Sequence, residues 1–150
     1  MKRWLILATV FTLCLSLVGC NPKLVFELPF DSADISNVEM YRQTVPVSAE
    51  KKTITGRDDM EALYQLFDGL AVSDRKTEPV AGGGITSFRF HLSDGTSYEI
   101  IYCSEAVKSG RLKIPSAGAD YFTSADLGAC WDHYDYETEA ANESELPGME

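Results

Sequence analysis

The chain is short of positive charge: 13 lysine and arginine side chains stand against 23 aspartate and glutamate side chains, so the formal charge is −10. This balance argues against binding to nucleic acid or to an anionic membrane surface, because phosphates would be repelled over most of the protein. The sequence also lacks an apolar run of about 20 residues, the length that spans a bilayer comfortably. Its length of 150 residues predicts one compact domain.

The motifs of well-known catalytic and cofactor sites are missing as well. Gly-x-Ser-x-Gly, His-Glu-x-x-His, an EF-hand loop and Cys-x-x-Cys do not occur. The glycine run at 82–84 precedes a strand pattern, not a Lys-Ser/Thr pair that begins a helix, so it does not predict a phosphate-binding loop. His91 and His133 lie in surroundings that do not predict a rigid metal site. We therefore predict no enzyme activity, no cofactor and no bound metal.

The first 20 residues have the pattern of an export signal. Lys2-Arg3 precedes a charge-free stretch over 5–18, and Leu-Val-Gly at 17–19 leads into Cys20. A positive start, an apolar segment of 7–15 residues and a small residue at the cut are typical of a secretory signal peptide. The Leu-Val-Gly-Cys end resembles a bacterial lipobox, which implies that Cys20 receives a diacylglyceryl group and becomes the first residue after cleavage. Cys14 lies in the middle of the apolar segment and has no small residue before it, so we expect it to be unmodified.

This resemblance implies a lipoprotein on the extracytoplasmic face of a bacterial cell membrane, with membrane lipid as its partner through acylated Cys20. Two fatty acyl chains, such as palmitate, are enough for stable attachment. Two alternatives remain: a secreted protein cut near Gly19 that keeps Cys20 as a thiol, and an uncleaved anchor. Removal of residues 1–19 takes away two positive charges, and the formal charge becomes −12.

Composition divides the remaining chain into three parts. Residues 20–34 have the character of a tether, although their apolar residues leave open that part of the segment packs as an edge. Residues 35–130 have the patterns of a folded domain. Residues 131–150 carry seven acidic and no basic side chains, so we predict an acidic, mostly disordered tail, with docking of its first aromatic residues left open.

Hydrophobic periodicity predicts the elements of the domain. An apolar stripe from Met60 to Leu70 indicates a helix of about 12–14 residues, with Thr55 as its N-cap. Residues 85–92 and 97–103 alternate as strands around an Asp-Gly turn, and shorter strand patterns follow at 111–114 and 118–122. We therefore predict an α+β fold: an antiparallel sheet of about four to six strands with one amphipathic helix packed on one face.

Two further cysteines, Cys103 and Cys130, follow the lipobox cysteine. Outside the cell membrane a disulfide between them would persist. A bridge closing a loop of this size would stabilise the fold by about 3 kcal/mol. Their spacing does not decide between a disulfide and two free thiols, so both remain open.

Three patterns in the stretch 35–122 resemble small, uncharacterised lipoproteins of Gram-positive, clostridia-like bacteria. They are Lys-Thr-Ile-Thr at 52–55 before the helix, the stripe over 60–70, and Phe-Arg-Phe-His-Leu-Ser-Asp-Gly-Thr at 88–96. The resemblance implies a cell-surface location and an α+β fold, and no catalytic residues.

The sequence favours a non-enzymatic binding or sensing module for a protein, peptide or cell-envelope partner. The alternative is a small-molecule or ion-binding lipoprotein that serves a transporter, although such two-lobed binders are more than twice as long. A third hypothesis is an enzyme that uses Cys103 or His91. Acidic composition again argues against a nucleic-acid partner.

Overall fold

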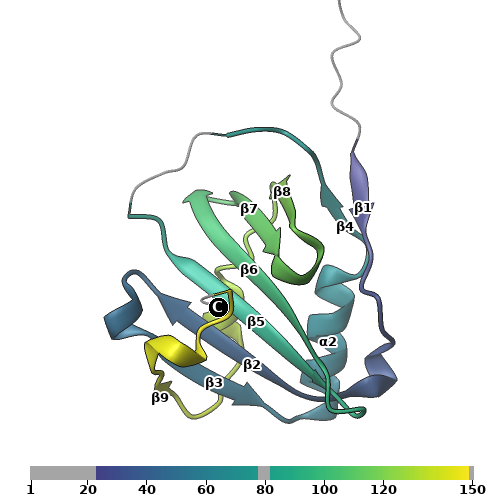
Figure 1. Cartoon of the computed structure of the whole chain (residues 1–150), viewed down its shortest axis with the longest axis vertical. Helices are drawn as coiled ribbons and strands as arrows, with labels where there is room; N and C mark the ends of the chain where they lie inside the picture. Colours follow the sequence, from purple (N-terminus) through teal and green to yellow (C-terminus); the bar gives the residue numbers. More distant parts are fainter. Residues whose placement is uncertain (1–22, 78–81, 149–150) are drawn as a thin grey trace, which may run out of the picture.

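The computed structural model describes residues 23–77 and 82–148. The strands are β1 (Leu24–Phe26), β2 (Ile35–Gln43), β3 (Glu50–Ile54), β4 (Leu70–Val72), β5 (Ile85–Leu92), β6 (Ser97–Ala106), β7 (Ser109–Ile114), β8 (Ala119–Thr123) and β9 (Glu139–Ala140). The helices are α2 (Arg57–Phe67) and α3 (Cys130–His133), with short 3-10 turns η1 (Ser32–Asp34), η2 (Pro46–Ser48), η3 (Pro115–Ala117) and η4 (Glu143–Glu145). Figure 1 shows their arrangement.

The main sheet has seven strands in the order β8-β7-β6-β5-β2-β3-β9, and every neighbouring pair is antiparallel. A second, two-stranded sheet pairs β1 with β4. An isolated antiparallel bridge between Ser73 and Phe122 connects the end of β4 to β8. The α+β prediction is confirmed, but the main sheet is larger than the expected four to six strands because the predicted tail adds β9, and the predicted tether adds β1 to a second sheet.

Helix α2 packs on one face of the main sheet. Phe67 lies edge-on to Phe88 and Phe90 of β5, with ring centroids 4.8 Å and 5.9 Å apart. The helix is shorter than its apolar stripe predicted, because Gly69 turns the chain at a φ of +91° and Leu70 already belongs to β4. Gly56, not the predicted Thr55, is the N-cap.

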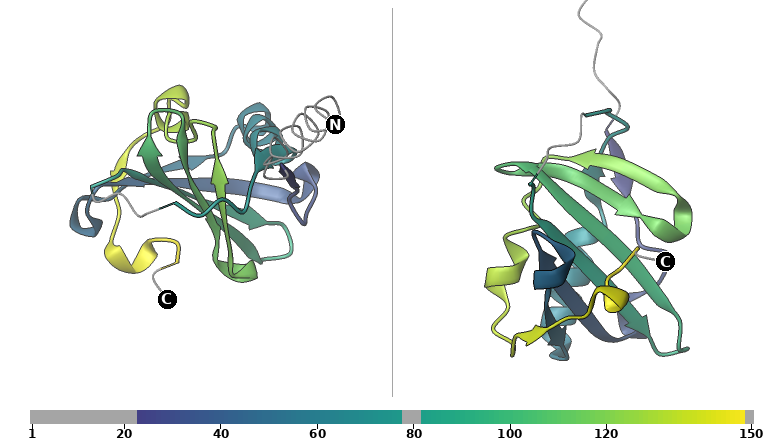
Figure 2. Two further views of the ribbon diagram at one scale, coloured as in Figure 1. Left: turned by 90° about the horizontal axis from the view of Figure 1, so that it is seen from above. Right: turned by 60° about the vertical axis from the view of Figure 1, so that its left-hand side comes forward.

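The opposite face of the sheet carries the alternate side chains, and we call it the open face. Cross-strand pairing places Glu39 of β2, Arg89 of β5 and Glu99 of β6 side by side there. Figure 2 shows the last part of the chain, in yellow, on this side of the sheet and α2 on the other.

The predicted tether is largely part of the fold. β1 begins at Leu24, and Phe26 and Leu28 are buried in the main core. Their packing against other apolar side chains outweighs the proline and acidic residues that suggested a spacer. The predicted signal peptide and Cys20 lie outside the described residues, and within 23–77 and 82–148 no helix is long and apolar enough to cross a membrane.

The prediction of a mostly disordered tail is wrong for the described residues 131–148. This part of the chain wraps around β3: α3 packs on the helix side, β9 pairs with β3 as the edge strand, and Leu146 packs on Tyr41 of the open face. We call residues 130–148 the C-terminal clasp. Its acidic residues meet basic partners supplied by the sheet, since Asp132 pairs with Arg42 at 3.3 Å and Glu145 pairs with Lys51 at 3.7 Å.

Candidate functional site

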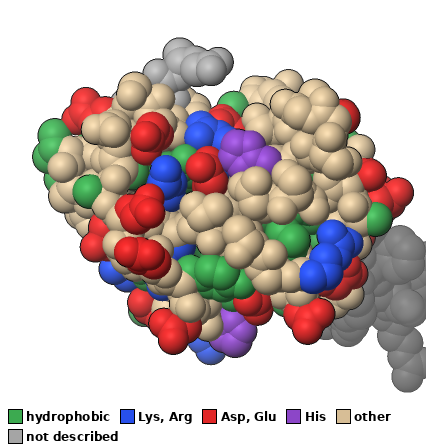
Figure 3. All heavy atoms as spheres, turned by 90° about the horizontal axis from the view of Figure 1, so that it is seen from below, with side chains coloured by type: hydrophobic (Ala, Val, Ile, Leu, Met, Phe, Trp, Pro, Cys, Tyr) green, Lys and Arg blue, Asp and Glu red, His purple; other side chains and the backbone are tan. Residues whose placement is uncertain are grey.

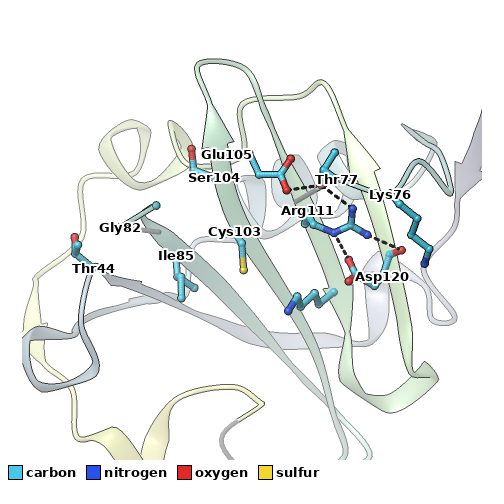
Figure 4. A pocket seen from close by; sticks show the side chains of 12 residues that line it. Thr44, Lys76, Thr77, Gly82, Ile85, Cys103, Ser104, Glu105, Arg111 and Asp120 are labelled. Atoms are coloured by element: carbon cyan, nitrogen blue, oxygen red, sulfur yellow. Dashed lines mark hydrogen bonds and ion pairs between the residues drawn. The ribbon is translucent and has the colours of Figure 1, made fainter. Parts of the chain in front are cut away.

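A hollow of about 430 Å³ lies on the open face, where β6 ends and β5 and β7 begin, beside the segment that follows β4 (Figure 4). Its lining includes Ile85, Cys103, Glu105, Arg111, Lys113 and Asp120. Register explains this grouping, because Ile85 pairs with Cys103, Cys103 with Arg111, and Lys113 with Asp120, so their side chains share one face.

Arg111 forms the rigid wall of the hollow. Its Nε donates to Oδ1 of Asp120 at 2.8 Å, and Nη1 donates to the carbonyl of Arg75 at 3.0 Å and to Oγ1 of Thr77 at 2.9 Å. The Thr77 hydroxyl in turn donates to Glu105 at 2.5 Å. Figure 4 shows the Arg111 guanidinium held between Thr77 and Asp120. With its donors already engaged, Arg111 shapes the hollow and leaves ligand binding to other groups.

Two lysines give the hollow its unsatisfied positive charge. Lys76 lies at the rim and Lys113 comes from β7, and neither ammonium forms an ion pair with any described side chain. Ammonium groups donate hydrogen bonds and accept none. With Arg111 the two lysines outnumber the two carboxylates of the lining, Glu105 and Asp120, so the hollow is suited to a ligand group that carries negative charge or accepts hydrogen bonds.

The Cys103 thiol faces this hollow and is not activated. Burial raises the pKa of Cys103, and the opposing positive charge of Lys113 and Arg111 does not compensate. The thiolate is the nucleophilic form of cysteine, so this side chain is mainly the unreactive thiol at neutral pH. The geometry favours binding at this position over covalent chemistry.

The structure does not bring the two predicted cysteine partners together. Cys103 and Cys130 are both free thiols. Cys103 lies on the open face, whereas Cys130 packs at the edge of the helix-side core, across the sheet from it. Burial raises the pKa of Cys130 to about 11. Of the two outcomes left open by the sequence, the structure contains the two free thiols.

His91 does not approach Cys103 either. His91 is six positions along β5 from Ile85, the residue that pairs with Cys103, a separation of about 20 Å along the strand. Its Nε2 lies 2.9 Å from Oε2 of Glu39. The two residues that the enzyme hypothesis offered as alternatives therefore lie at separate places on the open face. Within the described ranges, no group of three or more His, Cys, Asp and Glu residues could hold a metal ion.

A network of charged groups joins the middle strands on the open face. The Glu39 carboxylate accepts hydrogen bonds from the Tyr41 hydroxyl at 2.8 Å and Nη1 of Arg89 at 3.4 Å. Arg89 also pairs with Glu99 at 2.7 Å. Burial by itself would raise the pKa of Glu39, but hydrogen bonds from His91 and Tyr41 with nearby positive charge lower it. This network links β2, β5 and β6 on the open face, and the clasp reaches it where the Gly148 N–H donates to Glu99 at 3.2 Å.

Sequence reasoning missed Arg111 and the Glu39 network. The signal available in the sequence was that Arg111 is a charged residue inside a strand pattern, beside apolar residues such as Leu112, which the structure buries. Such a charge usually needs a partner across the strand, but the partner's identity depends on register, which the sequence alone does not provide.

Comparison with known proteins returned no match: no family model, no curated protein and no solved structure is significantly similar to the chain.

Proposed function

We propose that the protein is a lipid-anchored, non-enzymatic binding module on the extracytoplasmic face of the cell membrane, related to the small lipoproteins that its sequence resembles. The observation that supports the anchor is the apolar segment that ends in Leu-Val-Gly before Cys20. The bound partner is a protein, peptide or cell-envelope component that presents an anionic or hydrogen-bond-accepting group.

The hollow supports the binding role. It combines a rigid wall at Arg111, the free ammonium of Lys113 and a protonated thiol at Cys103. These groups recognise a ligand through charge and hydrogen bonds, and they offer no activated nucleophile. An anionic side chain or terminal carboxylate of a partner would satisfy the ammonium that the fold leaves without an ion-pair partner.

Subcellular fractionation tests the anchor. Cys20→Ala should move the protein from the membrane fraction to the medium, because the acyl chains would be lost. Cys14→Ala is the matched control and should stay with the membrane. Retention of the Cys20→Ala protein in the membrane fraction would overturn the lipid anchor.

Site-specific photocrosslinking in intact cells tests the binding role. A photoreactive residue at Thr44, which is exposed and lines the hollow, should give a discrete adduct. The same group at Ser93, an exposed position at the far turn, should not. Lys113→Glu should abolish the adduct and Lys113→Arg should preserve it. Absence of an adduct from Thr44 in membrane-anchored protein would count against a partner at this hollow.

The hollow also supports the alternative, a small anionic ligand delivered to a transporter. Its volume of about 430 Å³ lies in the range of small-molecule pockets. Thermal unfolding in the presence of small carboxylates and phosphates distinguishes the two functions. A rise in Tm that Lys113→Glu removes would favour the small ligand, because a molecule that binds only the folded state stabilises it.

A further inference from the structure

The position of the fold relative to Cys20 limits how the domain can face the membrane. This inference rests on the proposed lipid anchor. Only residues 21–23 separate Cys20 from the first residue of β1, Leu24. A fully extended chain spans at most about 3.6 Å per residue, so β1 begins within roughly 14 Å of the anchored cysteine. The end of the domain that carries Leu24 must therefore lie close to the bilayer.

The turn between β6 and β7 belongs to the same end. Leu24 pairs with Val72, the next residue Ser73 bridges to Phe122, and Phe122 pairs with Arg111 near the start of β7. The steps from β1 to β4, from β4 to β8 and from β8 to β7 are three strand spacings, so about 15 Å separates β1 from β7. Figure 1 shows the start of β1 and the end of β6 at the same, upper end of the molecule. We call this region, with residues 23–25, 73–76 and 106–109, the β1 end.

The β1 end exposes mainly positive and apolar side chains, and Asp74 is the one acidic residue in these ranges. Lys23, Arg75 and Lys108 are exposed, and none forms an ion pair with a described side chain. The Arg75 guanidinium lies 4.8 Å above the Phe122 ring, which holds its charge in place. Val25 and Val107 beside them are 64% and 88% exposed.

The opposite end of the sheet is acidic. The turn at 93–96 hydrogen-bonds to η1, since Ser93 N donates to the Asp34 carbonyl at 2.8 Å, and the first turn of α2 lies beside them. Acidic residues of this region are Asp31, Asp34, Asp58, Asp59 and Asp94, and they outnumber the one arginine of the same turn of α2, Arg57. Strand β6 runs between the two ends, a distance of about 30 Å. Figure 3, which views the molecule from this far end, shows acidic side chains in red spread over the surface, with basic side chains in blue among them.

We propose that the β1 end rests on an anionic bilayer surface, with Lys23, Arg75 and Lys108 against lipid phosphates and Val25 and Val107 in the headgroup region. Lysine and arginine near an anionic leaflet are attracted to it within about a Debye length, some 8–10 Å. The acidic far end is repelled, so both ends favour the same orientation. The overall charge of −10 argued against such a surface, but it averages two ends of opposite sign.

Depth-dependent fluorescence quenching of the full-length, lipidated protein in vesicles tests this orientation. One fluorophore is attached at Val107→Cys and, in a separate sample, at Ser93→Cys, in a background with Cys103→Ser and Cys130→Ser. Vesicles contain phosphatidylcholine with or without phosphatidylglycerol, and a headgroup-attached quencher. We expect quenching at 107 to exceed that at 93 by roughly twofold or more in the anionic vesicles, and the excess to fall in neutral vesicles.

Charge variants test whether electrostatic attraction to anionic lipid, and not only the short link to Cys20, holds residue 107 near the bilayer. Arg75→Gln with Lys108→Gln should reduce the excess quenching at 107. Thr138→Glu with Ser144→Glu changes the net charge by the same amount at exposed positions of the clasp and should leave it unchanged. Equal quenching at 107 and 93 in protein that floats with the vesicles would overturn the orientation alone. Protein that does not float with the vesicles would overturn the lipid anchor, and the orientation with it.

Discussion

The Nζ of Lys52 lies 2.9 Å from the carbonyl oxygen of Trp131, which is 79 residues away in the chain. The same ammonium donates to the Tyr134 carbonyl at 2.8 Å and lies 4.8 Å from the centroid of the Trp131 ring. Lys52 is buried, with 9% of its surface exposed. One lysine on strand β3 therefore satisfies the end of α3 and holds the start of the C-terminal clasp on the sheet.

Lys52→Met should destabilise the protein by roughly 2–4 kcal/mol, because two buried carbonyls lose a charged donor. Urea unfolding followed by tryptophan fluorescence measures this loss. Trp131 is the only tryptophan after Cys20, so its emission also reports the release of the clasp. Lys108→Met is the matched control and should leave stability within about 0.5 kcal/mol, since Lys108 is exposed. Equal stability of the two variants would contradict this role for Lys52.

Tyr136 of the clasp completes the start of helix α2. Its hydroxyl accepts a hydrogen bond from the Gly56 N–H at 3.0 Å and donates one to Asp59 at 2.7 Å. The hydrogen bond to Asp59 raises the pKa of Tyr136. Tyr136→Phe should cost about 1 kcal/mol, the usual value of a helix cap, as measured by chemical denaturation.

Tyr64→Phe provides the comparison for the Tyr136 variant. Tyr64 also lies partly buried, and its hydroxyl makes no hydrogen bond with the described residues. Its ring remains packed on Phe30 after the change. A loss of stability as large for Tyr64→Phe as for Tyr136→Phe would show that ring solvation, not capping, is responsible.

Glu39→Gln should destabilise the fold by about 1–3 kcal/mol at neutral pH, since the charged acceptor of the open-face network is lost. Glu39 has its pKa lowered below 4.5 in the folded state, so its contribution is complete above pH 4.5 and is lost as the pH falls through the lowered value. Denaturation from pH 7 to pH 3 should therefore show the difference between the native protein and Glu39→Gln shrinking with acidity. A difference that stays constant or grows below pH 4.5 would disprove this coupling. Glu143→Gln, at an exposed position, should show no such dependence.

The two cysteines of the folded domain should be reduced and slow to react. A thiol with a pKa of about 11, as at Cys130, is ionised only to about one part in ten thousand at pH 7. We expect slow alkylation of native protein, with Cys103 ahead of Cys130 because it faces the hollow, and two reactive thiols after unfolding. Peptide mapping by mass spectrometry checks this. A linked peptide pair containing Cys103 and Cys130 would contradict the free thiols.

Local signals predicted the elements that depend on neighbouring residues. The alternation around the Asp-Gly turn at 93–96 predicted the β5–β6 hairpin, and the patterns at 111–114 and 118–122 predicted β7 and β8. The apolar stripe predicted α2, with Met60, Leu63 and Phe67 buried. These succeed because side-chain period and turn geometry are properties of short segments.

The sequence did not predict the sites that form between side chains of different strands. Arg111 meets Asp120 and Thr77 only because β7 lies between β6 and β8 while the segment after β4 folds over it. The sequence left open whether Cys103 and Cys130 pair. Strand register places Cys103 on the open face, whereas Cys130 begins α3 and packs against the helix-side core. Strand order and register depend on contacts between distant segments, and a shift of one residue would reverse every face.

The sequence by itself determined the α+β class, the main helix and the central hairpin, since each is encoded by composition or periodicity within a short window. The export and lipidation signal that it predicts over residues 1–20 stays a prediction. Only the tertiary structure decided that the acidic C-terminal segment is folded. Its charges repel one another when counted alone, but Arg42 pairs with Asp132 and Lys51 pairs with Glu145. Lys52 donates to the Tyr134 carbonyl, and each of these contacts joins residues more than 80 positions apart in the chain. Long-range charge pairing and burial of Trp131 and Leu146 reverse the local prediction, because stability depends on the partners a segment meets as well as on its own composition.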